Sequence, residues 1–145
     1  MKQKKIKAIN ELKKDAWDLL SKIVRLRQSN DWGFGFCVTC FIDKGEKTQV
    51  SWKTLQAGHY QSGRGNSILF DERGIRPQCF GCNMRKQGNT NAFLIYLERE
   101  IGKEAAHRLK DELHVLSRKP RQFARYELEG MIENYTLQLK RMGGI

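Results

Sequence analysis

The chain has no apolar segment long enough to cross a bilayer, and only 39% of its 145 residues are hydrophobic. A membrane-spanning helix needs about 18 consecutive apolar residues, and the basic N-terminus also lacks the apolar stretch of a secretory signal. A core with so few apolar residues favours an additional stabilising element. We therefore expect one compact cytoplasmic domain that has no membrane partner.

Acidic residues are scarce compared with basic ones. The chain contains 16 Asp and Glu but 27 Lys and Arg, which gives a formal net charge of +11. The excess of basic residues is largest in residues 1–30. Such a charge attracts polyanions and speeds their encounter with the protein. A solvated basic face without a partner is the alternative, and nucleic acid is the partner that we expect.

Hydrophobic periodicity divides the chain into three regions. Residues 1–30 predict a basic N-terminal helix from Lys2 to about Gln28. Residues 31–92 are rich in glycine; "FGFCVTC" predicts a strand that enters a tight cysteine turn, and "ILF" predicts a second short strand. Residues 93–145 predict three helices, at 93–101, 105–116 and 123–142. The last of these carries an apolar stripe that suits either the core or a second subunit.

All four cysteines fall in two Cys-x-x-Cys pairs, Cys37 with Cys40 and Cys79 with Cys82. Zinc binds four thiolates in a tetrahedral arrangement, and two such turns supply them. Thioredoxin-like redox chemistry uses one pair in a strand–loop–helix setting rather than two. We therefore predict that the four cysteines hold a structural zinc ion.

His59 lies between the two pairs, in the stretch "LQAGHYQSGR", and is not needed to complete a four-thiolate shell. A neutral imidazole accepts a proton near physiological pH, and beside a phosphodiester it could convert water to hydroxide. A histidine bonded to the backbone of a zinc-tethered hairpin is an equally common structural alternative. The sequence motifs around His59 are therefore needed to choose between a catalytic and a structural histidine.

Those motifs resemble a known group of nucleases. A histidine midway between two Cys-x-x-Cys pairs, with "CN" at the second pair, resembles the HNH or His-Me finger (ββα-metal) nucleases. The segments "AGHY", "F-x-E-R-x-I-x-x-Q-C", "C-N-x-x-K-x-G-N" and "IG-x-E-A" resemble the phage NinG (Rap) recombination endonucleases more closely. Together with the first cysteine pair, they run from about Cys37 to Ala105.

The resemblance implies an α+β fold in three parts that form one compact domain. A zinc-stabilised ββα-metal (HNH) finger, residues 31–92, lies between the N-terminal helix, residues 1–30, and a C-terminal helical extension, residues 93–145. His59 is implied to be the catalytic base, and Asn83 is implied to bind a catalytic Mg²⁺ or Mn²⁺ ion.

The implied function is that of a divalent-metal-dependent DNA endonuclease. Its substrates would be branched recombination intermediates such as Holliday junctions and D-loops, in the cytoplasm of the host cell if a phage encodes the chain. A second copy of the chain and recombination proteins are further candidate partners.

Two glycines depart from the HNH pattern. Gly74 falls near its middle asparagine, so another group or a backbone carbonyl must orient His59. Gly58 stands where many HNH enzymes carry an acidic or histidine metal ligand, which leaves Asp71 and Glu72 as candidate second ligands. Basic residues around the site are candidate DNA contacts, namely Arg64, Arg73, Arg76, Arg85 and Lys86.

Two other functions compete with the structure-selective nuclease. The glycines at positions 58 and 74 also fit a zinc-stabilised DNA-binding module that has no catalytic activity. Non-selective HNH nicking endonucleases share the same motifs. The three functions predict different cleavage of branched and linear DNA.

Overall fold

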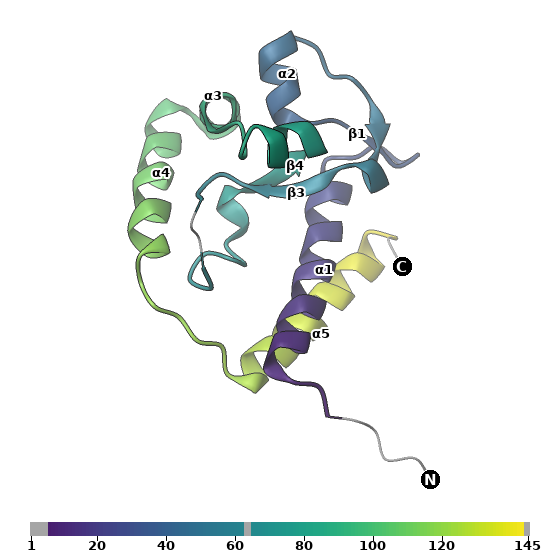
Figure 1. The fold of residues 1–145 in the computed structure, drawn as a ribbon. Helices are drawn as coiled ribbons and strands as arrows, with labels where there is room; N and C mark the ends of the chain where they lie inside the picture. The colour runs from purple at the N-terminus through teal and green to yellow at the C-terminus, as the bar shows by residue number, and fades with distance from the viewer. Residues whose placement is uncertain (1–5, 63–64, 144–145) are drawn as a thin grey trace.

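The computed structural model describes residues 6–62 and 65–143, which form helices around two small antiparallel sheets (Figure 1). The α-helices are α1 (Ile9–Arg27), α2 (Val38–Lys44), α3 (Thr90–Ile101), α4 (Lys103–Ser117) and α5 (Arg125–Arg141). One sheet pairs β1 (Phe34–Gly35) with β2 (Val50–Ser51), and the other pairs β3 (Gln56–His59) with β4 (Ile75–Gln78). The shorter turns are η1 (Trp52–Thr54), η2 (Glu72–Gly74) and the π-helical turn η3 (Gly81–Arg85). No helix within these ranges is long and apolar enough to span a membrane.

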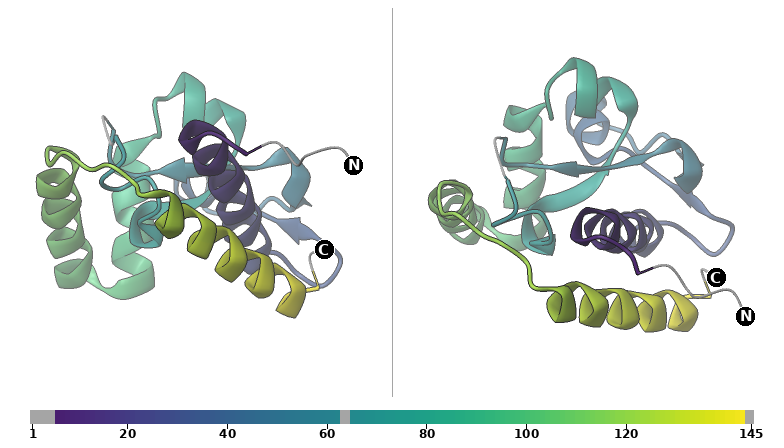
Figure 2. Two further views of the ribbon diagram at one scale, coloured as in Figure 1. Left: turned by 90° about the horizontal axis from the view of Figure 1, so that it is seen from below. Right: turned by 60° about the horizontal axis from the view of Figure 1, so that its bottom comes forward.

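The elements lie in layers, with α5 outermost, then α1, then the β3–β4 sheet, and then the segment that contains α2 and α3 (Figure 2, right). The apolar stripe of α1 faces the sheet on one side and α5 on the other. Its buried members pack against one residue from each strand and two from α5; the cluster consists of Ala16, Leu20, Ile23, Val24, Ala57, Ile75, Tyr135 and Leu139. Helix α1 is therefore the central support of the sheet that carries His59.

The predicted C-terminal helices are confirmed, and the stripe on the last one packs within the chain. Leu128, Tyr135 and Leu139 of α5 are buried, and the last two contact α1. A second, separate core lies where α3 and α4 pack together, around the fully buried Phe93 and Leu97. The core alternative, rather than a second subunit, thus accounts for the stripe on α5.

Helix α1 begins at Ile9, whereas the predicted N-terminal helix begins at Lys2; residues 2–5 of that prediction lie outside the described residues. The backbone of Ala8 is extended, and residues 6–8 are not helical. Ile6 is the one apolar residue between Lys2 and Lys7, and it is 80% exposed. Ile6, Lys7 and Ala8 are all exposed, so packing does not support a helix over these three residues.

The predicted strand at "ILF" is wrong, because residues 68–70 form a turn. Their backbone is used locally, since the Asp71 amide donates to the Ile68 carbonyl at 3.1 Å. Ile68 is buried in the α3–α4 core, which explains the apolar run without a strand. The strand that pairs with β3 is instead β4, with His59 opposite Ile75. In "FGFCVTC" only Phe34 and Gly35 are a strand, because α2 begins at Val38.

Candidate functional site

The four cysteines converge in space from two separate turns. Cys37 and Cys40 belong to the start of α2, while Cys79 follows β4 and Cys82 lies in η3. All four sulfurs lie within 4.8 Å of one another, and Cys40 Sγ is 3.5 Å from Cys82 Sγ and 3.7 Å from Cys79 Sγ. Tetrahedral zinc with bonds of about 2.3 Å places its sulfurs about 3.8 Å apart, whereas a disulfide needs about 2.05 Å. The donor set fits a bound zinc ion.

Hydrogen bonds to the sulfurs favour thiolates at this centre. The Cys40 amide donates to Cys37 Sγ, and the Cys82 amide donates to Cys79 Sγ, each at 3.4 Å. Burial alone raises the pKa of the Cys37 thiol, but donors that include the Thr39 hydroxyl outweigh it and bring the pKa down to about 7. Burial and the neighbouring sulfurs raise the pKa of Cys40. Four thiolates so close together therefore require the positive charge of a metal.

The side chain of Gln78 connects the end of β4 to this centre. It is fully buried, and its Nε2 donates to the Gly88 carbonyl at 2.8 Å and to Thr39 Oγ1 at 3.1 Å. Because the amide nitrogen only donates, Thr39 Oγ1 accepts this bond and keeps its own proton for Cys37 Sγ, 3.3 Å away. Gln78 thus fixes the direction of a hydrogen bond to a metal ligand.

Gly58 is required because Gln78 fills the place of a side chain there. A Cβ at position 58 would lie 1.8 Å from Gln78 Oε1, far inside van der Waals contact. That oxygen is buried and has no hydrogen-bond partner among the described residues. The position at which many HNH enzymes carry a metal ligand is therefore occupied by a neutral amide from the neighbouring strand.

Replacing Gly58 with alanine is expected to destabilise the protein by about 3 kcal/mol, since the new methyl group must displace a held amide and break its two hydrogen bonds. The melting temperature should fall by roughly 10 °C, measured by circular dichroism of the zinc-loaded protein. Gly130→Ala is the matched control, because a Cβ there meets nothing within 4 Å. In a Gln78→Ala background, Gly58→Ala should cause almost no further loss of stability. An unchanged loss of stability would show that the clash with the Gln78 amide is not its cause.

His59 occupies the last position of β3 and is held on two sides. Its Nε2 lies 3.0 Å from the Leu69 carbonyl, and its ring stacks on Trp17 with centroids 4.9 Å apart and planes inclined by 24°. A carbonyl only accepts hydrogen bonds, so Nε2 carries the proton of the neutral ring. The lone pair that can accept a proton is consequently on Nδ1.

Gly74, which falls near the middle asparagine of the HNH pattern in the sequence, contributes its backbone and has no room for a side chain. A Cβ on Gly74 would lie 2.6 Å from Leu113 Cδ1, so no side chain fits. The Gly74 carbonyl instead accepts a hydrogen bond of 2.8 Å from the amide of Tyr60, the residue after His59. Two carbonyls, those of Leu69 and Gly74, thus fix the imidazole and the end of its strand.

Asn83 lies across a cleft from α1. Its Nδ2 donates to Gln56 Oε1 at 2.8 Å, which joins η3 to the start of β3. Within the described residues β3 pairs only with β4, and its residues Gln56 and Ala57 line this cleft. The β3 edge cleft has a volume of about 310 Å³ and is lined by Trp17, Ser21, Arg25, Leu55, Gln56, Ala57 and Asn83. Trp17 lines this cleft and also stacks on His59, which ends the strand that contributes Gln56 and Ala57 to the cleft.

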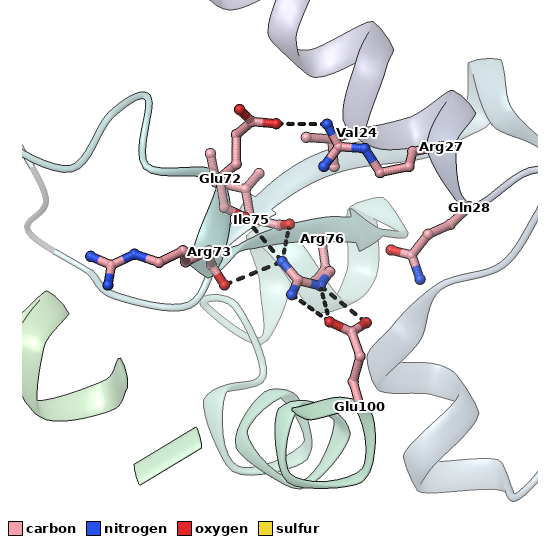
Figure 3. A pocket seen from close by; sticks show the side chains of 8 residues that line it. All are labelled: Val24, Arg27, Gln28, Glu72, Arg73, Ile75, Arg76 and Glu100. Carbon is pink, nitrogen blue, oxygen red and sulfur yellow. Dashed lines mark hydrogen bonds and ion pairs between the residues drawn. The ribbon is translucent and has the colours of Figure 1, made fainter. Parts of the chain in front are cut away.

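The structure does not bring Asp71 and Glu72 to Asn83. Glu72 is ion-paired with Arg27 at 2.7 Å, and Asp71 with Arg73 at 2.8 Å. The hydrogen bond from Arg73 lowers the pKa of Asp71, with burial opposing it. Glu72 lines a different cavity, of about 450 Å³, whose side chains are shown in Figure 3 and do not include Asn83.

The candidate DNA-contact residues differ in how many hydrogen bonds and ion pairs they already form within the protein. Arg76 is only 14% exposed and donates to Glu100 and to three carbonyls (Figure 3), which leaves it little capacity for phosphate. Arg73 also pairs with Glu112. Arg85 ends η3 and Lys86 follows it; both are exposed, and Lys86 Nζ lies 3.7 Å from a carboxylate oxygen of Asp43. Arg64 lies outside the described residues.

Several residues of the site were not predicted from the sequence. Ser21 and Arg25 follow Trp17 at intervals of four along α1, so the three lie on one helical face. This spacing was available in the sequence and placed polar residues beside an apolar stripe. The role of Gln78 has no such signal, because its partners come from α2 and from the turn after η3.

Comparisons with known proteins agree on one family. A family model described as "Bacteriophage Lambda NinG protein" matches residues 1–143. The chain is 35% identical over 75 residues to protein ninG of Escherichia phage 933W, a match that covers 51% of this chain and 34% of that protein. It is 33% identical over 75 residues to protein ninG of Escherichia phage lambda, with 51% and 33% covered. Each match thus covers about a third of the curated relative's length, and no solved structure matches.

Proposed function

We propose a function for this chain from one premise, that it belongs to the phage NinG family. The chain acts as a structure-selective DNA endonuclease that hydrolyses phosphodiesters in branched recombination intermediates. One observation carries this proposal: His59 ends β3, two other residues of β3 line a cleft together with Asn83, and Asn83 directly follows Cys82 of the cysteine cluster. In this proposal the imidazole supplies the proton acceptor and the Asn83 amide supplies an oxygen ligand for a hard cation.

In this proposal β3, β4 and η3 form a ββα-metal (HNH) finger. The order of the elements supports it, since an antiparallel strand pair is followed at once by a helical turn. The four cysteines hold zinc, which keeps the strand pair and the turn in register and takes no part in the reaction. Such rigidity matters because a displacement of about 1 Å between reacting groups costs roughly 100-fold in rate.

His59 removes a proton from the attacking water through Nδ1. The hydrogen bond from Nε2 to Leu69 keeps the ring in the required tautomer and stabilises the cationic ring that forms. The Asn83 amide oxygen would hold a Mg²⁺ or Mn²⁺ ion, and Gln56, which accepts a hydrogen bond from the Asn83 amide nitrogen and lines the same cleft, would orient that amide. When bound, that ion neutralises the phosphoryl oxygens and the leaving oxygen.

Recognition of branched DNA would depend on backbone contacts, to which Arg85, Lys86 and Arg64 contribute. Arg85 and Lys86 are on the same turn as Asn83 or next to it, so they lie beside the proposed metal. A second copy of the chain would supply the second cut that a four-way junction needs. Recombination proteins remain further proposed partners.

A DNA-binding module without catalysis is the second candidate. It is favoured by Gly58, because the filled position beside Gln78 removes the acidic ligand that many HNH enzymes use there. Its cleft would then bind a phosphate without hydrolysing it.

Incubation with a labelled four-way junction and a matched linear duplex separates these functions. We expect nicks in the junction at least 10-fold faster than in the duplex with Mg²⁺, and none with EDTA. Binding of both DNAs without nicks would favour the non-catalytic module. Equal nicking of both would favour a non-selective HNH nicking enzyme.

A further inference from the structure

Arg25 is a half-buried cation at the β3 edge cleft that lacks an acidic partner. Its Nε donates to the Ser21 carbonyl at 3.0 Å, and one terminal nitrogen donates to the Leu55 carbonyl at 3.4 Å. Ion pairs engage Arg27, Arg73 and Arg76 nearby, but none is formed by Arg25 with any carboxylate in the described part of the chain. A buried charge without a counter-ion is costly, so this position favours an anion supplied from outside.

The guanidinium is fixed in place before any ligand arrives. It lies over the Trp52 ring with its central carbon 4.9 Å from the ring centroid. The two carbonyl bonds use only two of its five N–H donors, and the others can bind two phosphate oxygens at once. Burial lowers the pKa of Arg25, with Asp18 opposing it, but an arginine remains charged at neutral pH.

We propose that Arg25 is a phosphate-binding residue, which holds a DNA backbone phosphate in the β3 edge cleft opposite Asn83. This inference rests on the proposed function, and it adds α1 to the DNA-binding surface. Trp17 and Ser21 line the cleft from the same helical face, which places the phosphate between that face and η3. The DNA backbone would thus follow β3 toward His59.

The test is the salt dependence of DNA binding without cleavage. Binding of a fluorescent four-way junction is measured in EDTA between 50 and 300 mM KCl for the parent, Arg25→Gln and Arg27→Gln. The Arg27 variant is the matched control, because it removes an equal charge two residues away from an arginine that already pairs with Glu72. Loss of one phosphate contact should reduce the slope of log K against log salt by about 0.9 for Arg25→Gln alone. Equal slopes for the two variants would overturn the inference.

A second measurement uses the unaltered protein, so it tests the proposal even if the Arg25 variant fails to fold. In ¹H–¹⁵N spectra, the Arg25 Nε–H signal should shift on addition of the junction in EDTA, whereas the Arg27 signal should not. An unmoved Arg25 signal at saturating DNA would contradict the proposal. Both experiments report on binding, so a chain that binds through Arg25 but never cleaves would refute the nuclease function and leave this site intact.

Discussion

Removal of zinc is expected to abolish the cooperative unfolding of the protein. Among the described residues, the apolar cluster around the four cysteines contains only Leu55 and Val50 besides the cysteines themselves. Both strands of the β1–β2 sheet are two residues long and cannot persist alone. Zinc bound by four thiolates contributes about 10–16 kcal/mol in small domains, which equals or exceeds the net stability of about 5–15 kcal/mol of a typical domain.

Thermal unfolding followed by circular dichroism, with the zinc content measured in parallel, checks this prediction. Protein treated with a strong chelator should lose its sharp transition, and Cys82→Ser should behave in the same way without a chelator. Return of the transition after one equivalent of zinc is the control for irreversible damage. A zinc-free protein that melts cooperatively at the temperature of the parent would contradict a structural role for the metal.

Replacing His59 with glutamine is expected to lower the rate constant of DNA cleavage by about 10²- to 10⁴-fold, the usual contribution of a general base. Glutamine retains a donor for the Leu69 carbonyl but cannot accept the proton of the attacking water. The affinity for DNA should stay within about threefold of the parent, because the imidazole acts only on the reacting water. The loss therefore belongs to the chemical step.

Single-turnover cleavage of the junction with excess enzyme and saturating Mg²⁺ measures that step directly. His107→Gln is the matched control, since His107 pairs with Glu98 on the α3–α4 side and should leave the rate unchanged. Cleavage by His59→Gln at the parental rate would remove His59 from the mechanism. Equal losses in both histidine variants would point to a general effect on the fold.

Local sequence patterns predicted the parts of the fold that depend on local physics. Helical periodicity located α3, α4 and α5, and the spacing of Cys37, Cys40, Cys79 and Cys82 predicted the metal centre. The strand predicted at "ILF" from its short apolar run was wrong, because such a run is compatible with both a strand and a buried turn. Tertiary packing decided that case, through the burial of Ile68 against α3 and α4.

The details of the site depend on contacts that no local pattern encodes. In the sequence, Gly58 stands where many HNH enzymes carry a metal ligand. In the structure, the Gln78 side chain leaves no room for any side chain at position 58. Asp71 and Glu72 were candidate ligands on sequence proximity alone, and arginines engage both of them elsewhere. Arg25 lies more than thirty residues before His59, and only the packing of α1 against β3 brings it to the cleft.

The proposed mechanism requires that the His59 ring, at the end of β3, lies beside a divalent cation bound by Asn83. Broadening of NMR signals by paramagnetic Mn²⁺ is the sharpest test of this arrangement. The chain has three histidines, and only His59 ends β3, since His107 and His114 lie on α4. Titration of zinc-loaded protein with Mn²⁺ should broaden the ¹H–¹⁵N ring signals of His59 alone, and Asn83→Ala should prevent the effect. His59 signals that stay sharp at saturating Mn²⁺, or that broaden no more than those of His107 and His114, would contradict the account.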